Sequence, residues 1–248
     1  MIAEQYRKML DAKSVIRQLS EKATKRAQII GAENVFDYSL GNPSVPAPAE
    51  FKQALLDLIE KEDPMTLHGY SPTLGIPSVK TAIAESLNCR FDMNYGPEHI
   101  FPVSAAAAAH ALRAVTVPGD EVLTFAPFFP EYHPYVDLTG AVLKVVPADT
   151  KSFQINFEAF EEMLGPRVAA VLVNTPNNPS GAVYSAETLT KLAQVLTRKA
   201  EQYGHDIFLI SDEPYREIVF DGKQQPYVSK FYANTISCYS FSKALSLP

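Results

Sequence analysis

Apolar runs and helical patterns alternate along the second half of the chain. Five short runs rich in Val, Ile, Leu and Phe predict buried strands, at residues 121–127, 141–147, 168–176, 206–214 and 235–242. Residues 129–138 are predicted as a helix or turn, and helical periodicity covers 157–164 and 185–203. Because apolar strands separated by helices form parallel sheets covered on both faces, the sequence predicts an α/β fold with a mostly parallel central sheet.

The first half of the chain is predicted to be mainly helical. Residues 3–29, 49–61 and 75–89 carry helical patterns, and the first of these ends near Gly31. An alanine-rich helix is predicted over 104–115, where small side chains allow close packing. Between the first two helices, "FDYSLGNPSVPAPAE" contains three prolines and a glycine, and this composition predicts an extended connector.

Composition and charge exclude several classes of protein. The net charge is −6, with 46% hydrophobic and 20% charged residues, as in an ordinary soluble globular protein. No apolar stretch approaches the roughly 20 residues that cross a bilayer, and the charged, amphipathic N-terminus lacks the apolar core of a secretory signal. An acidic balance without a basic run argues against nucleic-acid binding. We therefore expect neither a membrane nor a nucleic-acid partner.

The cysteines and histidines form no redox or metal-binding pattern. Cys89 and Cys238 are far apart and lack CxxC spacing, so we expect no disulfide and a cytoplasmic location. The five histidines show neither HxxxH nor HExxH spacing. Surface or capping roles are therefore preferred to a metal site.

Polar clusters follow three consecutive predicted strands. They read "NTPNNPSG" after 168–173, "SDEPY" after 207–210 and "SFSK" after 235–239. In parallel α/β sheets, ligands bind outside the carboxyl ends of the strands. These strand ends are therefore the predicted functional site.

Two of these clusters also have purely structural interpretations. "NNPSG" is good turn chemistry, while its functional interpretation is that Asn178 projects an amide donor into a cleft. Asp212 is costly at the end of a buried strand unless a cation or several donors meet it, and a helix N-cap or a salt bridge to Arg216 would satisfy it. Its functional interpretation is a counter-ion for a protonated heterocycle, with Tyr215 supplying a phenol to the same cleft.

An amine and an anion site complete the set of candidate groups. Most lysines are solvated surface charges, but Lys243 follows an apolar strand, where desolvation can keep an amine neutral and able to attack a carbonyl. Ser240, three residues earlier, is placed to hold an anion nearby. Ser104 opens the alanine-rich helix, whose N-terminus is either a simple serine cap or an anion site.

One ligand needs all of these groups. Pyridoxal 5′-phosphate has a phosphate, a pyridine nitrogen, a phenolic oxygen and an aldehyde. It therefore requires an anion site lined by N–H groups, a carboxylate, phenol or amide donors and a lysine amine. Its flat ring also needs an aromatic or apolar face, which Phe129 in "APFFPEY" offers. The candidate residues therefore predict a site for this cofactor.

The order and separation of the motifs resemble those of fold-type I, class I/II pyridoxal-phosphate aminotransferases of the aspartate aminotransferase kind. The resemblance runs from "LGNPSVPAP" through "GYSPTLGIPSVKTAIAE", "PGDEVLTFAPFFPEY", "NTPNNPSG" and "ISDEPYREI" to "SFSK", across essentially the whole chain. It implies an enzyme that moves an amino group between an amino acid and a 2-keto acid. It also implies a homodimer that uses pyridoxal 5′-phosphate.

The resemblance implies roles for the matching positions only. Lys243 would hold the cofactor as a Schiff base and shuttle the substrate proton, and Asp212 would keep the pyridine nitrogen protonated. Tyr215 and Asn178 would donate hydrogen bonds to the phenolic oxygen. The remaining positions would contact the phosphate (Ser240, Ser104, Ala105, Ala106 and, on the neighbouring subunit, Tyr70), the ring (Phe129) or the substrate carboxylate (Gly41, together with Asn178).

The sequence departs from the family pattern in two places. Val103-Ser104-Ala105 has no glycine where the phosphate loop of the family usually has one, so the register of this loop stays open. The sequence also stops at Pro248, before the family's phosphate-binding arginine, an interior antiparallel strand and the C-terminal small domain. We therefore expect a truncated enzyme with exposed sheet edges and little or no transamination. Residues 1–45 would form an N-terminal arm and part of the small domain, and residues 46–248 an incomplete large cofactor-binding domain.

Other functions remain open at this point. The same scaffold supports β-elimination, decarboxylation and side-chain lyase chemistry, including carbon–sulfur bond cleavage. The chain could also be an inactive fragment or a binding module, although the presence of both Lys243 and Asp212 argues against long decay. A nucleotide-binding domain is less favoured, because no GxGxxG or P-loop motif follows any predicted strand. The sequence does not specify the substrate amino acid.

Overall fold

The protein divides into two compact units, one ending at Pro46 and the other covering Ala47–Leu247. The computed structural model describes residues 7, 15–41, 45–103 and 106–247. The first unit contains helix α2 (Val15–Ile30) and the 3-10 turn η1 (Ala32–Asn34). Gly31 has φ 90°, a conformation that favours glycine, and this residue ends α2 as predicted. The predicted helix over 3–29 is thus confirmed from Val15, and most of its earlier residues lie outside the described part.

The second unit begins with three helices. Helix α3 (Ala49–Lys61) confirms the predicted helix, and α5 (Pro77–Phe91) begins two residues later than predicted. Proline at the first position of α5 explains this start, because a proline there loses no intrahelical hydrogen bond. The sequence did not predict α4 (Pro64–His68), a short helix capped by Asp63, whose side chain accepts a bond from the Thr66 N–H (3.0 Å).

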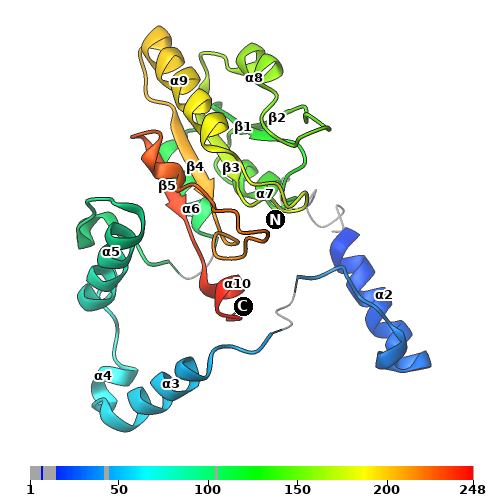
Figure 1. Cartoon of the computed structure of the whole chain (residues 1–248), viewed down its shortest axis with the longest axis vertical. Helices are drawn as coiled ribbons and strands as arrows, with labels where there is room; N and C mark the ends of the chain where they lie inside the picture. Colours follow the sequence, from blue (N-terminus) through cyan, green and yellow to red (C-terminus); the bar gives the residue numbers. More distant parts are fainter. Residues whose placement is uncertain (1–6, 8–14, 42–44, 104–105, 248) are drawn as a thin grey trace. The chain divides into compact units, whose positions relative to one another are not determined.

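A five-stranded parallel sheet forms the centre of the second unit (Figure 1). The strands are β1 (Glu121–Phe125), β2 (Val142–Val146), β3 (Val168–Asn174), β4 (Phe208–Asp212) and β5 (Thr235–Cys238). Their order is β2-β1-β3-β4-β5, and each neighbouring pair is parallel. The predicted α/β class with a parallel sheet is therefore confirmed.

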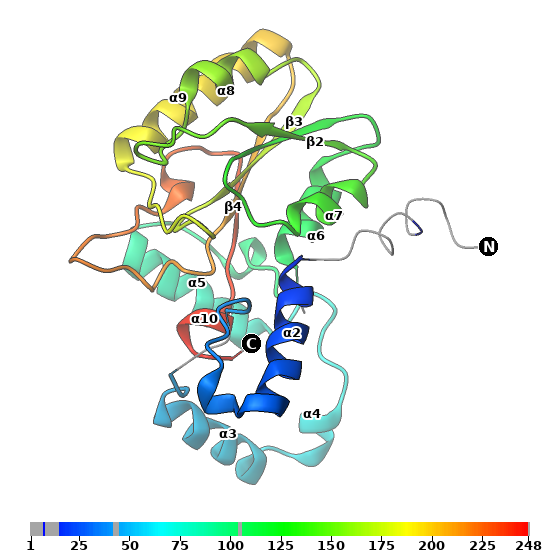
Figure 2. The same cartoon turned by 90° about the vertical axis from the view of Figure 1, so that its right-hand side faces the viewer.

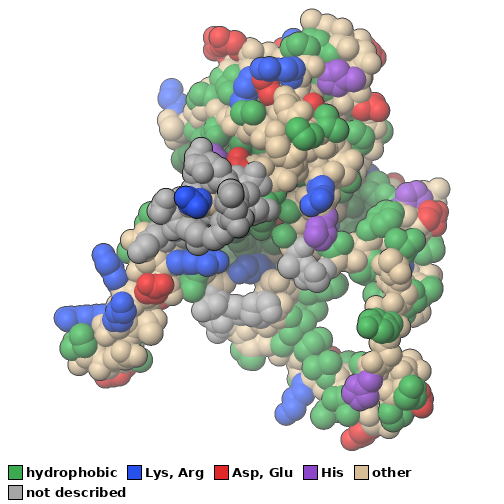
Figure 3. Space-filling model, turned by 180° about the vertical axis from the view of Figure 1, so that it is seen from behind, with side chains coloured by type: hydrophobic (Ala, Val, Ile, Leu, Met, Phe, Trp, Pro, Cys, Tyr) green, Lys and Arg blue, Asp and Glu red, His purple; other side chains and the backbone are tan. Residues whose placement is uncertain are grey.

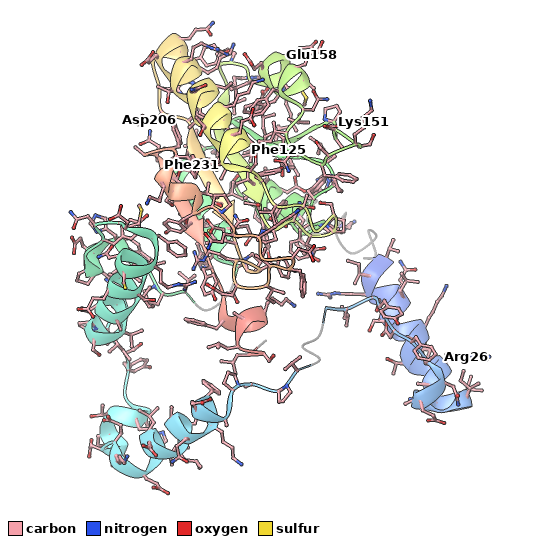
Figure 4. All side chains as sticks on the ribbon, in the orientation of Figure 1. Arg26, Phe125, Lys151, Glu158, Asp206 and Phe231 are labelled. Atoms are coloured by element: carbon pink, nitrogen blue, oxygen red, sulfur yellow. The ribbon has the colours of Figure 1, made fainter. Side chains whose placement is uncertain are left out.

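Helices cover both faces of the sheet (Figure 2). Helices α8 (Phe157–Met163) and α9 (Ala186–Tyr203) pack on one face, and α6 (Ala107–Val115) and α7 (Tyr132–Asp137) pack on the other. Side chains along a strand alternate between these layers: Leu123 belongs to the first and Val122 to the second. Phe125 and Phe231, labelled in Figure 4, lie in or against the first layer. The unit therefore has two apolar layers on one rigid sheet.

The apolar run over 235–242 is a strand only as far as Cys238, which agrees to within one residue with the strand end at 239 predicted before "SFSK". Strand β5 ends at Cys238, and residues Phe241–Ala244 form the short helix α10. The Ser240 hydroxyl accepts a hydrogen bond from the Ser242 N–H (3.0 Å) and so caps this helix. A serine side chain that bonds to nearby backbone competes with strand pairing, which explains the change. Two further 3-10 turns, η2 (Pro97–His99) and η3 (Val228–Lys230), precede α6 and β5.

No helix within the described ranges is long and apolar enough to cross a membrane. In that same part of the chain, no three His, Cys, Asp or Glu side chains are grouped so as to hold a metal ion.

Candidate functional site

The carboxyl ends of the parallel strands bring the predicted clusters to one edge of the sheet. In the strand register, Asn174 of β3 lies beside Asp212 of β4, and Asp212 lies beside Cys238 of β5. The segments that contain Asn178, Tyr215 and Lys243 follow these three residues directly. The sheet therefore gathers the "NNPSG", "DEPY" and "SFSK" segments at the place where α/β sheets bind ligands.

Asp212 accepts a hydrogen bond from a tyrosine that the sequence did not identify. The Tyr132 hydroxyl, from the fully buried side chain on α7, donates to Asp212 Oδ2 (2.7 Å). Burial raises the pKa of Asp212 to about 6, and the bond from Tyr132 opposes this rise. Burial, together with the charge of Asp212, also raises the pKa of Tyr132. The phenol therefore stays protonated and acts as the hydrogen-bond donor. Arg216, the alternative partner considered for Asp212, instead pairs with Glu213 and Glu217.

Two asparagines connect β3 to the Asp212 turn. Asn174 Nδ2 donates to the Asp212 carbonyl (2.9 Å), and Asn174 Oδ1 accepts from the Asn178 N–H (2.6 Å). Asn178 Nδ2 in turn donates to the Tyr215 hydroxyl (3.4 Å). The structure thus brings together Asn178 and Tyr215, which the sequence placed in one cleft. Asn174 was not predicted, although an asparagine that ends a buried strand was a usable signal.

Phe129 lies beside the residue that binds Asp212. Its ring meets that of Tyr132 edge-to-face, with centroids 5.8 Å apart and an interplanar angle of 87°. This contact is the favoured geometry for two aromatic rings. Phe129 is half-buried, so part of its ring is not covered by the protein.

Ser240 and Lys243 lie in the segment that follows β5. Besides capping α10, the Ser240 hydroxyl is 2.6 Å from the Ser242 hydroxyl. Lys243 is within α10 and is partly buried. The Glu213 N–H donates to the Cys238 carbonyl (2.8 Å), so the turn after β4 is bonded to the last residue of β5, five residues before Lys243.

The remaining predicted positions are placed as follows. Ala106 precedes α6 with φ 51°, the left-handed conformation in which glycine is favoured, while Ser104 and Ala105 lie outside the described residues. Tyr70 is fully exposed at the surface of the second unit. Gly41 belongs to the first unit. The roles of these positions stay predictions.

The donor set fits pyridoxal 5′-phosphate. A cationic ring nitrogen needs a carboxylate, and Asp212, partly buried at the strand ends, is ionised above about pH 6. An anionic ring oxygen needs donors, and the Asn178 amide and the Tyr215 phenol are already paired. Phe129 offers a ring face and Lys243 a primary amine. These groups come from consecutive segments of one sheet edge, which defines an α/β protein with a ligand site at its strand ends.

Comparisons with known proteins identify the family. The family model for aminotransferase class I and II matches residues 33–248. Aspartate aminotransferase of Thermotoga maritima is 29% identical over 230 residues, which cover 91% of this chain and 58% of that protein. A probable N-succinyldiaminopimelate aminotransferase of Mycobacterium tuberculosis is 32% identical over 215 residues, or 85% of this chain and 50% of that protein. The chain therefore belongs to the aminotransferase class I and II family.

A solved structure agrees with this assignment. The crystal structure of an amino transferase from Eubacterium rectale superposes with a TM-score of 0.95 at 45% identity, and it covers 100% of this chain and 63% of the other. The chain thus spans 50% to 63% of the length of these three relatives. Members of this family use pyridoxal 5′-phosphate.

Proposed function

We propose that the protein is a pyridoxal-phosphate-dependent aminotransferase, which moves an amino group between an amino acid and a 2-keto acid. One observation carries the proposal: an Asp212 carboxylate bonded to Tyr132 lies beside the Asn178–Tyr215 pair at adjoining strand ends. The chain spans little more than half the length of these relatives, and its own activity is therefore what the experiment below tests.

When bound, pyridoxal 5′-phosphate supplies an aldehyde that condenses with amines and a protonated ring that withdraws electrons from the substrate α-carbon. Asp212 stabilises positive charge at the ring nitrogen, and Tyr132 favours the ionised form of Asp212. Asn178 and Tyr215 donate to the ring oxygen, and Phe129 covers a ring face. Lys243 would hold the cofactor through its side-chain amine, and the same amine, once an incoming substrate amine displaces it, would accept the substrate α-proton.

Other residues would bind the phosphate and the substrate. Ser240 and the segment formed by Ser104, Ala105 and Ala106 would bind the phosphate, with Tyr70 reaching it from a second subunit. Gly41 and Asn178 would contact the substrate carboxylate. In this assignment, residues 46–248 are the cofactor-binding domain, and residues 1–45 are an arm and part of a small domain. The relatives are named for different amino-acid substrates. The proposal for this protein therefore names only the substrate class, an amino acid and a 2-keto acid.

A homodimer is part of the proposal. Helices α3 and α4 and the start of α5 expose many large apolar side chains, and Figure 3 shows hydrophobic residues at the surface of this region. They are Leu55, Leu56, Leu58, Ile59, Met65, Leu74, Ile76 and Val79. Contiguous exposed apolar surface is typical of an interaction site. Tyr70 lies in the same segment, so a second copy covering this surface would receive Tyr70 at its own site. A cytoplasmic location agrees with the two free cysteines, Cys89 and Cys238.

A product assay tests the proposed reaction. The protein is incubated with pyridoxal 5′-phosphate, a panel of amino acids and 2-oxoglutarate, and glutamate and the new 2-keto acid are measured. Because the chain spans little more than half the length of its relatives, we expect both products in equal amounts but at a low rate, and their loss in Lys243→Ala. Release of carbon dioxide, ammonia or a thiol without glutamate would favour a lyase on the same scaffold. Cofactor binding without any product would favour an inactive fragment or a binding module.

A further inference from the structure

The turn after β4 contains two charged residues to which the proposed function gives no role. The side chain of Glu213 is fully buried and that of Arg216 is 5% exposed, and 3.4 Å separates Glu213 Oε2 from Arg216 Nη1. Glu213 Oε1 also accepts a hydrogen bond from Ser237 Oγ of β5 (3.1 Å). The Glu213–Arg216 pair therefore joins this turn to the neighbouring strand inside the protein.

Three aromatic rings surround the Arg216 guanidinium, and we call this group the Arg216 cage. The guanidinium carbon lies 4.3 Å from the ring centroid of Tyr239, 5.1 Å from that of Phe91 and 5.4 Å from that of Tyr227. Phe91 ends α5, Tyr227 precedes η3 and Tyr239 follows β5. Aromatic faces attract cations through the ring quadrupole, so one guanidinium holds three separate segments together.

These segments lead directly into the candidate site. Tyr239 stands next to Ser240 and four residues before Lys243, and Arg216 stands next to Tyr215. The Arg216 N–H donates to the Glu213 carbonyl (3.2 Å), which closes the turn from Glu213 to Arg216, directly after Asp212. A displacement of the guanidinium would therefore move the Tyr215 segment relative to the Lys243 segment.

Stability alone is a weak explanation for this pair. Replacing a buried ion pair by apolar residues of similar volume is often neutral or stabilising, since both charges lose their hydration on burial. Burial raises the pKa of Glu213 more than Arg216 lowers it, so that burying the ionised carboxylate costs folding free energy. A charge-assisted pair does, however, fix one orientation of the groups that it joins.

We propose that Glu213 and Arg216 are positioning residues that hold the 212–216 turn against the end of β5, and so set Tyr215 relative to the helix that contains Lys243. This inference deepens the proposed function and rests on it for one of its two readouts. Neither side chain acts on the reacting atoms.

Two variants and a matched control test the proposal. Glu213→Gln removes the charge while it keeps the size of the side chain, and Arg216→Lys keeps the charge without the planar guanidinium. Glu121→Gln is the control, because Glu121 is another buried carboxylate with two ion pairs, to Lys144 and Arg167. It is the first residue of β1 and so lies away from the carboxyl ends of the strands, where the candidate site is. All three variants are expected to lower the thermal midpoint.

The first readout needs no cofactor. Tyrosines are labelled with carbon-13 in the ring, and the Tyr215 resonance is assigned with Tyr215→Phe. We expect this resonance to move or split in Glu213→Gln and in Arg216→Lys, and to stay in place in Glu121→Gln. The second readout is the affinity for pyridoxal 5′-phosphate. It should fall about tenfold in both variants, as happens when an outer partner of a binding group is removed, and stay unchanged in the control.

Each outcome decides between the two claims. A Tyr215 resonance that stays in place in both variants, with melting lowered as in Glu121→Gln, would overturn the positioning role. If the resonance moves but the unmodified protein does not bind the cofactor, the proposed function fails and the positioning pair stands. If Arg216→Lys does not fold, Glu213→Gln decides alone.

Discussion

The hydrogen bond from Tyr132 to Asp212 can be removed without changing the shape of the site. In Tyr132→Phe, the buried ring stays and only the hydroxyl that donates to Asp212 Oδ2 is lost. A hydrogen bond to a charged group is worth about 1.5–3 kcal/mol, and one pKa unit corresponds to about 1.4 kcal/mol. Because the lost bond favours the ionised carboxylate, the pKa of Asp212 should rise by about 1 to 2 from its value of about 6.

The pKa of Asp212 can be measured directly in the protein without cofactor. Aspartate carboxyl carbons are labelled with carbon-13 and titrated by NMR, and Asp212→Asn identifies the resonance. Tyr232→Phe is the control, because the buried Tyr232 hydroxyl donates to the Ile207 carbonyl (2.8 Å) and that variant also loses one hydrogen bond. A pKa of Asp212 that is unchanged or lower in Tyr132→Phe would refute the reasoning.

The same change should alter cofactor binding in a pH-dependent way. A carboxylate with a pKa between about 7 and 8 is between half and nine-tenths protonated at pH 7, so affinity for a cationic ring should fall about two- to tenfold there. At about pH 9 the carboxylate is ionised in both proteins, and the two affinities should converge. An equal loss of affinity at both pH values would instead indicate a packing defect.

Three further predictions concern stability, each measured by chemical unfolding. The pKa of Asp212 is raised from 3.8 to about 6 in the folded protein, so its ionisation lowers stability as pH rises through this range. Asp212→Asn should therefore be more stable than the unmodified protein by about 3 kcal/mol at pH 8 and by about half as much at pH 5. An equal gain in stability at both pH values would contradict this. Ala106→Gly should stabilise by about 0.5–1 kcal/mol, since φ is 51° at this position, and a loss of stability would show that the alanine is not strained. Glu121→Gln should destabilise by about 1–3 kcal/mol near neutral pH. Burial raises the pKa of Glu121, but Lys144 and Arg167 lower it by more, so that this pKa lies below its ordinary value. The difference in stability between Glu121→Gln and the unmodified protein should therefore shrink as Glu121 is protonated in acid. A difference in stability that persists in acid would contradict the ion-pair account.

The fold was predictable because its three central strands, β1, β3 and β4, are mostly buried. Runs such as 168–173 are continuously apolar, and this pattern is typical of an interior parallel strand. The carboxyl ends of the strands could then be placed at one edge of the sheet by the parallel rule alone. The sequence was less informative where local side-chain chemistry decides, as at Ser240, whose cap ends the strand earlier than the apolar pattern suggests.

The candidate site was only partly predictable for a related reason. Asp212, Asn178 and Tyr215 are polar residues at apolar strand ends, and they stand out in the sequence. Tyr132 lies in an aromatic segment, where a phenol that binds a carboxylate cannot be told from an ordinary core residue. The Arg216 cage is built from residues up to 148 positions apart, Phe91 and Tyr239, and no local pattern reports such a contact.

Trapping the cofactor on the protein tests the central claim most directly. The protein is incubated with pyridoxal 5′-phosphate, reduced with borohydride, digested and mapped by mass spectrometry, in parallel with Lys243→Arg and with Lys191→Arg, a lysine on α9. The account predicts one dominant adduct, on Lys243, which persists in Lys191→Arg and disappears in Lys243→Arg. Adducts spread over several lysines, with the same distribution in all three proteins, would contradict it.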